Sequence, residues 1–210
     1  MLLSDVDIQK FMSLGDIKIT NFSGGLQPAS YDLRVGNSGV LSDGIVDIAE
    51  RRFIKIPRGS TAVIYPYEEV KLSNRVAARY GLRSKLARRG LILLSGPQID
   101  PGFEGTLSVT VFNAGTDDVR LYYLEEFATV EFAELSSPAS KGYSGPYQGQ
   151  TVLAGEDIDL MTRRYKNFAQ IESELEKTAL QVGAVKELVY VVIIGLIVGI
   201  VVALAQKYLG

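Results

Sequence analysis

An uncharged run of eighteen residues, 188–205, places the strongest constraint on how this chain can fold. At about 1.5 Å per residue, a helix over this run approaches the ~30 Å thickness of a bilayer's hydrocarbon core. A buried helix of this length with no charged residue is unusual in a soluble domain. With five residues after the run, we expect a single membrane-spanning helix that acts as a C-terminal tail anchor.

The distribution of basic residues around this run predicts its orientation. Most of them precede it and one follows it, namely Arg163, Arg164, Lys166, Lys177 and Lys186 against Lys207. Basic residues near a span tend to stay on the cytoplasmic side. The N-terminus has no charged segment followed by a long apolar run, so a cleaved signal peptide is not expected. We expect the domain to face the cytoplasm.

The segment before the anchor has helical periodicity. Apolar or near-apolar residues recur every three or four positions, at Met161, Arg164, Phe168, Ile171, Leu175, Thr178, Val182, Val185 and Val189. This heptad pattern predicts a coiled-coil stalk over residues 161–187, although a surface helix packed on a domain can show a similar stripe.

The first 135 residues read as a β domain. Ser4 and Asp7 form a variant capping box that predicts a short helix at the start. Short apolar segments broken by turn residues follow at near-regular spacing, which favours a mainly β sandwich or jelly-roll-like barrel. The predicted strands are 31–35, 52–56, 62–65, 76–80, 91–94, 106–113, 119–123 and 128–134. Residues 136–160, which lack an apolar period, are expected to form an extended arm and linker.

Composition excludes several classes of chemistry. The chain has no Cys and no His, which excludes disulfides, thiol nucleophiles, Ser-His triads and zinc-dependent base deaminases. The formal net charge is −2, so a general nucleic-acid-binding surface is not expected. Any phosphate binding would have to be local.

One stretch could provide such a local phosphate site. Ser84 can cap a short helical turn that Gly90 closes, and the start of the turn offers free N–H groups to an anion. Arg83, Lys85 and Arg88 add cations. Asp100 follows in an Asp-Pro-Gly turn, so a carboxylate near a polyphosphate would suit water activation. A solvated basic surface and a simple turn are the alternatives.

Several motifs in this chain resemble those of the dCTP deaminase and trimeric dUTPase superfamily. They are Met1–Asp5, Gln27–Arg34, Arg83–Arg88, Ile99–Gly105 and Tyr147–Gln150, and they occur in the family's order over residues 1–150. The resemblance implies a distorted all-β barrel, a homotrimer whose sites lie between subunits, and an arm that crosses onto the neighbouring subunit to cover a deoxynucleoside triphosphate.

The resemblance also assigns roles to individual residues. Asp100 matches the aspartate that contacts the sugar 3′-hydroxyl and, in dUTPases, orients the attacking water. Phe103 matches the aromatic residue under the deoxyribose. Mg²⁺ would bridge the phosphate oxygens, without ligands from the protein. The implied substrate-binding residues are Arg83, Ser84, Lys85, Arg88, Phe103, Tyr143, Tyr147 and Gln150.

Three departures from the family pattern bear on activity. Thr110 stands where the deaminase branch places a glutamate that shuttles protons, and Thr129 replaces a glutamine that shapes the site. Pro146 stands where a lysine usually precedes the arm tyrosine. Thr110 counts against deamination but not against dUTP hydrolysis, which makes dUTP diphosphatase the leading function, whereas Thr129, Pro146 and the anchor favour a protein without catalytic activity. The alternatives are dCTP deaminase, and a catalytically silent nucleotide sensor or trimeric membrane scaffold.

Overall fold

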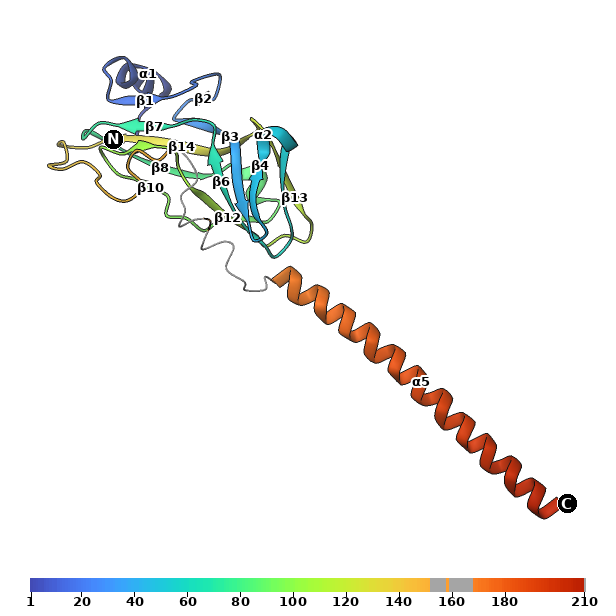
Figure 1. Ribbon diagram of the computed structural model, residues 1–210. Helices are drawn as coiled ribbons and strands as arrows, with labels where there is room; N and C mark the ends of the chain where they lie inside the picture. The colour runs from blue at the N-terminus through green and yellow to red at the C-terminus, as the bar shows by residue number, and fades with distance from the viewer. Residues whose placement is uncertain (152–157, 159–167, 210) are drawn as a thin grey trace. The chain divides into compact units, whose positions relative to one another are not determined.

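The computed structural model describes residues 1–151, 158 and 168–209 of the chain. The chain consists of two compact units, Met1–Tyr165 and Lys166–Gly210, and each is described by itself (Figure 1). The first unit is mainly β, as the sequence predicts. The second is a single long helix.

The first unit opens with helix α1 (Asp5–Ser13), which begins and ends where the sequence predicts. The Ser4 hydroxyl accepts a hydrogen bond from the Asp7 N–H at 3.2 Å, and the Asp7 carboxylate accepts one from the Ser4 N–H at 3.3 Å. This reciprocal pair satisfies N–H groups that the first helical turn leaves free. Gly15, just past the end, has a φ of +79°, a conformation that glycine adopts without strain. Ile8 and Phe11 bury the inner face of α1.

Antiparallel strand pairs build the rest of this unit. The largest sheet has the order β10-β8-β14-β3-β6-β12-β9, with β2 and β4 also paired to β3. Smaller sheets have the orders β1-β7-β11 and β13-β5. The bounds are β1 Ile17–Ile19, β2 Leu26–Gln27, β3 Ser30–Leu41, β4 Gly44–Asp47, β5 Phe53–Ile56, β6 Thr61–Pro66, β7 Val70–Leu72, β8 Val76–Leu82, β9 Leu91–Leu93, β10 Gln98–Ile99, β11 Glu104–Gly105, β12 Val109–Asn113, β13 Val119–Tyr122 and β14 Glu126–Glu134. The short helices α2 (Ile48–Arg51) and α3 (Ser84–Ala87) lie between strands.

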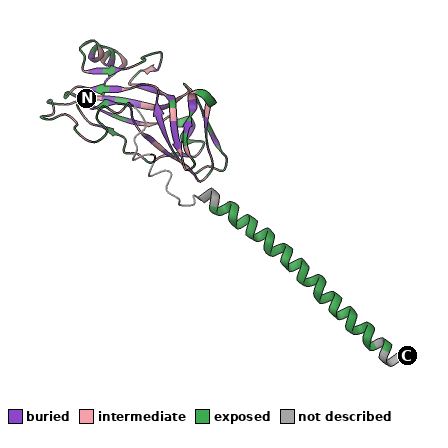
Figure 2. Ribbon diagram, viewed as in Figure 1, coloured by how far each residue is buried: buried purple, intermediate pink, exposed green. Residues whose placement is uncertain are grey.

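Strand β3 joins the two halves of the largest sheet. Its first part pairs with β14 and its later part with β6, and the register shifts between Val35 and Gly39. A Cβ on Gly36 would lie 2.6 Å from the Tyr65 carbonyl oxygen, so the strand can bend past β6 only with glycine there. This bend curls the sheet around one core, in which Tyr31, Phe127 and Phe132 are the largest fully buried side chains (Figure 2).

All eight strands predicted from the sequence are present, with two adjustments. Strand β3 extends to Leu41, well past the predicted end at Val35, because β4 folds back onto its second half. Strand β12 begins at Val109, three residues later than predicted, because the preceding segment turns to meet the arm at Thr106. The prediction of a mainly β fold followed by a C-terminal helix is confirmed.

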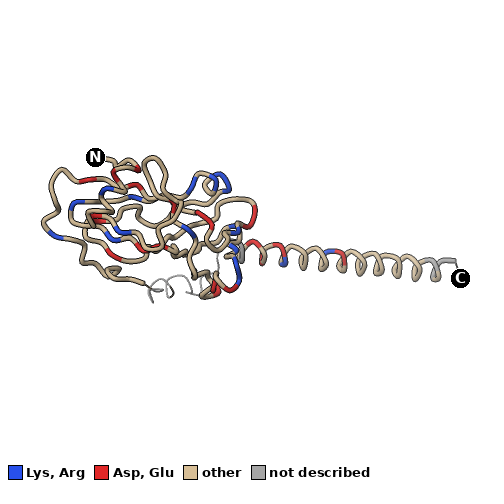
Figure 3. Tube along the Cα trace, turned by 90° about the horizontal axis from the view of Figure 1, so that it is seen from above, with Lys and Arg blue, Asp and Glu red and all other residues tan. Residues whose placement is uncertain are grey.

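Helix α5 (Phe168–Leu209) runs without interruption through the described part of the predicted stalk and through the predicted membrane span. It contains an 18-residue window of mean hydropathy 2.8, so by length and composition it can cross a membrane. Its described side chains are exposed (Figure 2), and its charges gather in the half nearer the β unit in sequence (Figure 3). Met161 and Arg164 of the predicted heptads lie outside the described residues. The coiled coil remains a prediction.

Candidate active site

A pocket of about 410 Å³ lies where the arm meets strands β8, β10 and β12. This size is within the range of small-molecule sites. Asp100, Phe103, Tyr143, Tyr147 and Gln150, all predicted from the sequence, line it together. The structure therefore brings five of the nine predicted site residues into one cavity.

Asp100 is held at the pocket by a tight turn. The Phe103 N–H donates to the Asp100 carbonyl at 3.2 Å, and Gly102 has a φ of +79°. A Cβ on Gly102 would lie 2.5 Å from the Cα of Gly142, so this turn can accept the arm only with glycine there. The Gln98 Nε2 donates to the Asp100 carboxylate at 2.5 Å, which fixes the orientation of the carboxylate.

The arm covers the pocket of its own chain. Its backbone bonds to the segment after Asp100: the Tyr143 N–H donates to the Pro101 carbonyl at 2.7 Å, and the Gly149 N–H donates to the Glu104 carbonyl at 2.8 Å. The Tyr143 ring meets the Phe103 ring edge-on at 5.7 Å. Residues 143–150 thus pair with their own barrel, and the crossing of the arm onto a neighbouring subunit stays a prediction.

Gln150 ends this docked segment. The Thr106 N–H donates to the Gln150 carbonyl at 2.7 Å, and the Gln150 Nε2 donates to the Ser108 hydroxyl at 3.2 Å. Gly105 forms an isolated parallel bridge with Gln150. The backbone of Gln150 is thus fixed next to the pocket, with its side-chain amide among the lining groups.

Tyr80 and Ser95 line the same pocket and were not identified from the sequence. The Tyr80 hydroxyl donates to the Ser95 Oγ at 2.9 Å, and burial raises the pKa of the Tyr80 phenol above its ordinary value. Tyr80 is one of the alternating buried residues of β8, so from the sequence it could be predicted only as a core residue. Ser95 lies in a short connection whose sequence carries no distinguishing pattern.

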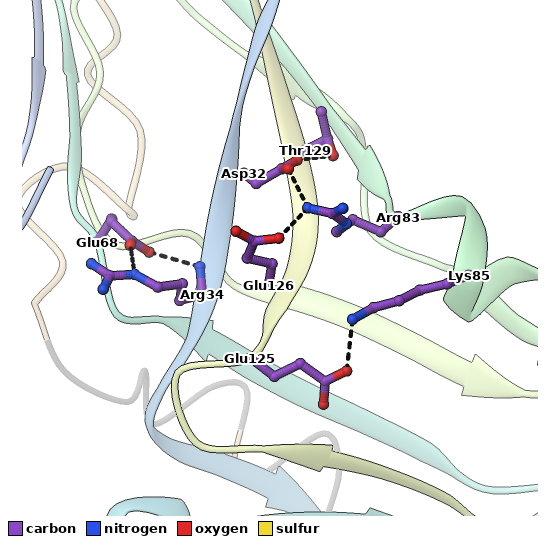
Figure 4. A network of polar contacts seen from close by, with 8 residues as sticks. All are labelled: Asp32, Arg34, Glu68, Arg83, Lys85, Glu125, Glu126 and Thr129. Carbon is purple, nitrogen blue, oxygen red and sulfur yellow. Dashed lines mark hydrogen bonds and ion pairs between the residues drawn. The ribbon is translucent and has the colours of Figure 1, made fainter. Parts of the chain in front are cut away.

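The predicted phosphate site lies around α3, and two of its cations, Arg83 and Lys85, are bound to carboxylates (Figure 4). The Arg83 Nη1 donates to Asp32 and to Glu126, and Lys85 pairs with Glu125 at 2.9 Å. Asp32, whose side chain is 4% exposed, also accepts from the Thr129 hydroxyl at 2.6 Å. Buried Asp32 thus fixes the guanidinium of Arg83, while the more exposed Glu126 is a partner that an anionic ligand could replace.

Two details of this phosphate site differ from the predictions. The N-cap of α3 is Arg83, without a side-chain capping bond, so Ser84 is the first helical residue and not the cap. The C-cap of α3 is Arg88, and Gly90, with a φ of +88°, lies two residues beyond it. Arg88 borders a separate hollow with Asp117 and Asp118, and none of Arg83, Ser84, Lys85 and Arg88 lines the Asp100 pocket of the same chain.

The chain matches the sequence model of a known family, dCTP deaminase-like, over residues 2–135. The chain belongs to this family. A dCTP deaminase of Thermococcus kodakarensis is 40% identical over 155 residues, which cover 73% of this chain and 96% of the relative. A "dCTP deaminase, dUMP-forming" of Aquifex aeolicus is 30% identical over 163 residues, covering 71% and 91%.

A solved structure has the same fold. The crystal structure of 2′-deoxycytidine 5′-triphosphate deaminase from Agrobacterium tumefaciens aligns with a TM-score of 0.53 at 17% identity, over 62% of this chain and 47% of that one. At this identity the likeness shows the dUTPase-like half-barrel fold alone. The family match ends at residue 135, so the arm and α5 lie beyond it.

The pocket of this dCTP deaminase-like protein contains few ionisable groups. Among the lining residues that the structure describes, Asp100 is the single carboxylate and there is no Lys or Arg. Thr110 also faces the pocket, and its N–H donates to the Ser95 Oγ at 3.2 Å. A threonine hydroxyl cannot serve as a general base near neutral pH, so Asp100 is the candidate base of this pocket.

Proposed function

We propose that the protein binds dCTP in the Asp100 pocket and deaminates it to dUTP without zinc. The observation that carries the proposal is the 40% identity, over nearly the whole length of the relative, to a protein named dCTP deaminase. The names of the relatives favour deamination over the dUTP hydrolysis that Thr110 favours. The pocket supports the proposal because its size suits a nucleoside and its walls combine aromatic rings with one carboxylate.

The chemistry requires a water molecule to add at C4 of the cytosine ring and the amino group to leave as ammonia. The water oxygen becomes the C4 carbonyl and loses two protons, of which one goes to ring nitrogen N3 and one to the leaving amine, and a single carboxylate can carry them in turn. Asp100 is the one lining carboxylate in the described part of the chain. Its Gln98 contact holds it in place for this proton transfer.

A second function, hydrolysis of dUTP to dUMP and pyrophosphate, is favoured by one specific observation. Thr110 lines the pocket where the deaminase branch places a proton-shuttling glutamate, and attack of water on a phosphate does not use that glutamate. The Aquifex aeolicus relative is named as forming dUMP from dCTP, so the two reactions also occur together in one named protein.

Mg²⁺ is the cofactor we propose, held through the phosphates of the nucleotide. In the described part of the chain no group of three or more Asp and Glu residues is placed to hold a metal ion. A hard cation with phosphate and water ligands fits such a protein. The ion would neutralise charge on the phosphate oxygens, while Arg83 and Lys85 would hold them.

A complete site requires α3 and the Asp100 pocket to bind the same nucleotide, α3 at its phosphates and the pocket at its nucleoside. Because Arg83, Ser84, Lys85 and Arg88 do not line that pocket in their own chain, we propose that each site combines the pocket of one subunit with α3 of another. This arrangement agrees with the homotrimer expected of the family. Helix α5 would anchor the trimer in a membrane, with the β unit on the cytoplasmic side.

The assay that tests the function uses the full chain in detergent with Mg²⁺ and either dCTP or dUTP. Ammonia and dUTP from dCTP are the expected products. Pyrophosphate from dUTP instead would support the second function, and both products together would indicate dUMP formation. Binding of nucleotide without any product would refute both enzymatic proposals and favour a nucleotide sensor or scaffold.

Anchoring and assembly can be tested together in cells that express the full chain. We expect the protein in the membrane fraction, resistant to high salt, because the apolar part of α5 buries in the bilayer. After solubilisation, light scattering corrected for detergent should give the mass of three chains. Recovery in the soluble fraction would contradict the anchor, and a monomer would contradict the shared site.

A further inference from the structure

The hydroxyl of Ser95 lies in the pocket where two hydrogen-bond donors converge. Its Oγ accepts from the Tyr80 hydroxyl at 2.9 Å and from the Thr110 N–H at 3.2 Å. All three residues line the cavity. A serine hydroxyl has two acceptor lone pairs and one proton to donate. Both lone pairs of Ser95 are therefore occupied, and its proton is left to donate.

The direction of the Tyr80 bond follows from the acidity of the two hydroxyls. A phenol is a stronger acid than an aliphatic alcohol and is the better donor. Burial raises the pKa of Tyr80, which is 7% exposed, so the phenol keeps its proton at neutral pH. The Thr110 N–H can only donate. Among the described residues, no hydrogen bond donated by the Ser95 hydroxyl is found.

The surroundings of Ser95 indicate what would accept this proton. Ile99, Phe103 and Leu107 give the pocket apolar walls, and its described lining contains no cation. A phosphate would lose its hydration there without gaining a charged partner. A flat, neutral ring with a carbonyl oxygen loses little hydration and supplies the acceptor that Ser95 lacks.

We propose that Ser95 donates a hydrogen bond to a ring carbonyl oxygen of the pyrimidine base, with Tyr80 as the residue that positions its proton. The inference rests on the proposed function, since it names the part of the nucleotide that this end of the pocket recognises. A hydroxyl that can only donate can bond to the carbonyl oxygens of cytosine and uracil. It cannot accept from an amino group in the same position, so a base with an amino group there is disfavoured.

The test is equilibrium binding to the full chain in detergent with three ligands. They are the α,β-imido analogues of dCTP and dUTP, which resist cleavage between the first two phosphates, and 2-deoxyribose 5-triphosphate, which has no base; the dCTP analogue is measured in the Asp100→Asn background, so that it is not deaminated. Ser95→Ala should weaken binding of the dUTP analogue by about 5- to 10-fold. It should leave the affinity for deoxyribose triphosphate unchanged.

Tyr80→Phe tests the positioning role without removing the Ser95 hydroxyl. We expect a smaller loss of affinity of about two- to threefold, again confined to ligands with a base. Without the Tyr80 hydroxyl, the Ser95 hydroxyl can rotate and its proton is no longer held in one direction. Ser13→Ala is the matched control, since the Ser13 hydroxyl is exposed and bonds to the Lys10 carbonyl within α1.

Each outcome separates the possibilities. An equal loss for deoxyribose triphosphate would assign Ser95 a structural role and overturn the inference. A loss confined to the dCTP analogue would mean that Ser95 accepts from the amino group, which also overturns it. If the unsubstituted protein binds none of the ligands, the inference and the proposed function both fail. If it binds them without turnover, and Ser95→Ala weakens only the base-bearing ligands, deamination fails and the inference stands.

Discussion

Asp100→Asn is expected to slow product formation by about 10²–10⁴-fold, the usual contribution of a positioned proton-transferring group. Asparagine keeps the size of the side chain and an oxygen that can still accept from Gln98, but it carries no charge and cannot take a proton from water. Nucleotide affinity should change much less than the rate. Single-turnover kinetics, together with binding of the imido analogues, separate the two quantities.

The matched control is Glu104→Gln, four residues further along the same segment. The Glu104 side chain is 52% exposed, pairs with Lys71 at 2.7 Å and does not line the pocket. Glu104→Gln should leave the rate of product formation within about twofold of that of the unsubstituted protein, because an exposed ion pair contributes little. If Asp100→Asn retained a similar rate, the proton transfer would have to be assigned to another group.

Arg34→Ala is expected to lower the free energy of unfolding of the β unit by about 3–5 kcal/mol. The side chain of Glu68 is fully buried, and Arg34 is its charged partner at 2.6 Å. The Arg34 Nη2 also donates to the Asn21 carbonyl at 2.7 Å, and its guanidinium lies over the Tyr67 ring. Without Arg34, an uncompensated carboxylate stays in the interior (Figure 4).

Urea unfolding of the full chain in detergent, followed by tyrosine fluorescence, measures this loss. Lys71→Ala removes a pair exposed by about half on both sides and should cost at most about 1 kcal/mol. The double variant Arg34→Leu and Glu68→Leu should recover much of the stability, because it leaves no buried charge. A loss below about 1 kcal/mol for Arg34→Ala would show that solvent reaches Glu68.

Features with local signals could be predicted from the sequence. The capping box at Ser4 and Asp7 and the eight predicted strands depend on residues close together in the chain. The missed strands are short, and their partners define them: β7 has three residues and is a strand because β1 and β11 flank it. Five of the six missed strands have two or three residues, too few for a period to be read, and β4 has four.

The site was predictable to the extent that motifs mark it. Asp100 and Phe103 were found in this way, and so were the arm residues. The path of the arm was not, since backbone bonds such as that from Thr106 to Gln150 leave no trace in side-chain types. The partners of Arg83 were also hidden, because Asp32 and Glu126 lie 51 and 43 residues away along the chain.

The continuity of α5 has a mechanical consequence. The helix has no break at residue 187, where the charged half gives way to the uncharged half. At about 1.5 Å per residue, the twenty residues from 168 to 187 extend about 30 Å. If the apolar half spans a bilayer, as we propose, the tilt of that half also sets the direction of the charged half. Bilayer thickness governs that tilt. A change in thickness would then change the direction of the charged half of α5, because the two halves form one continuous helix.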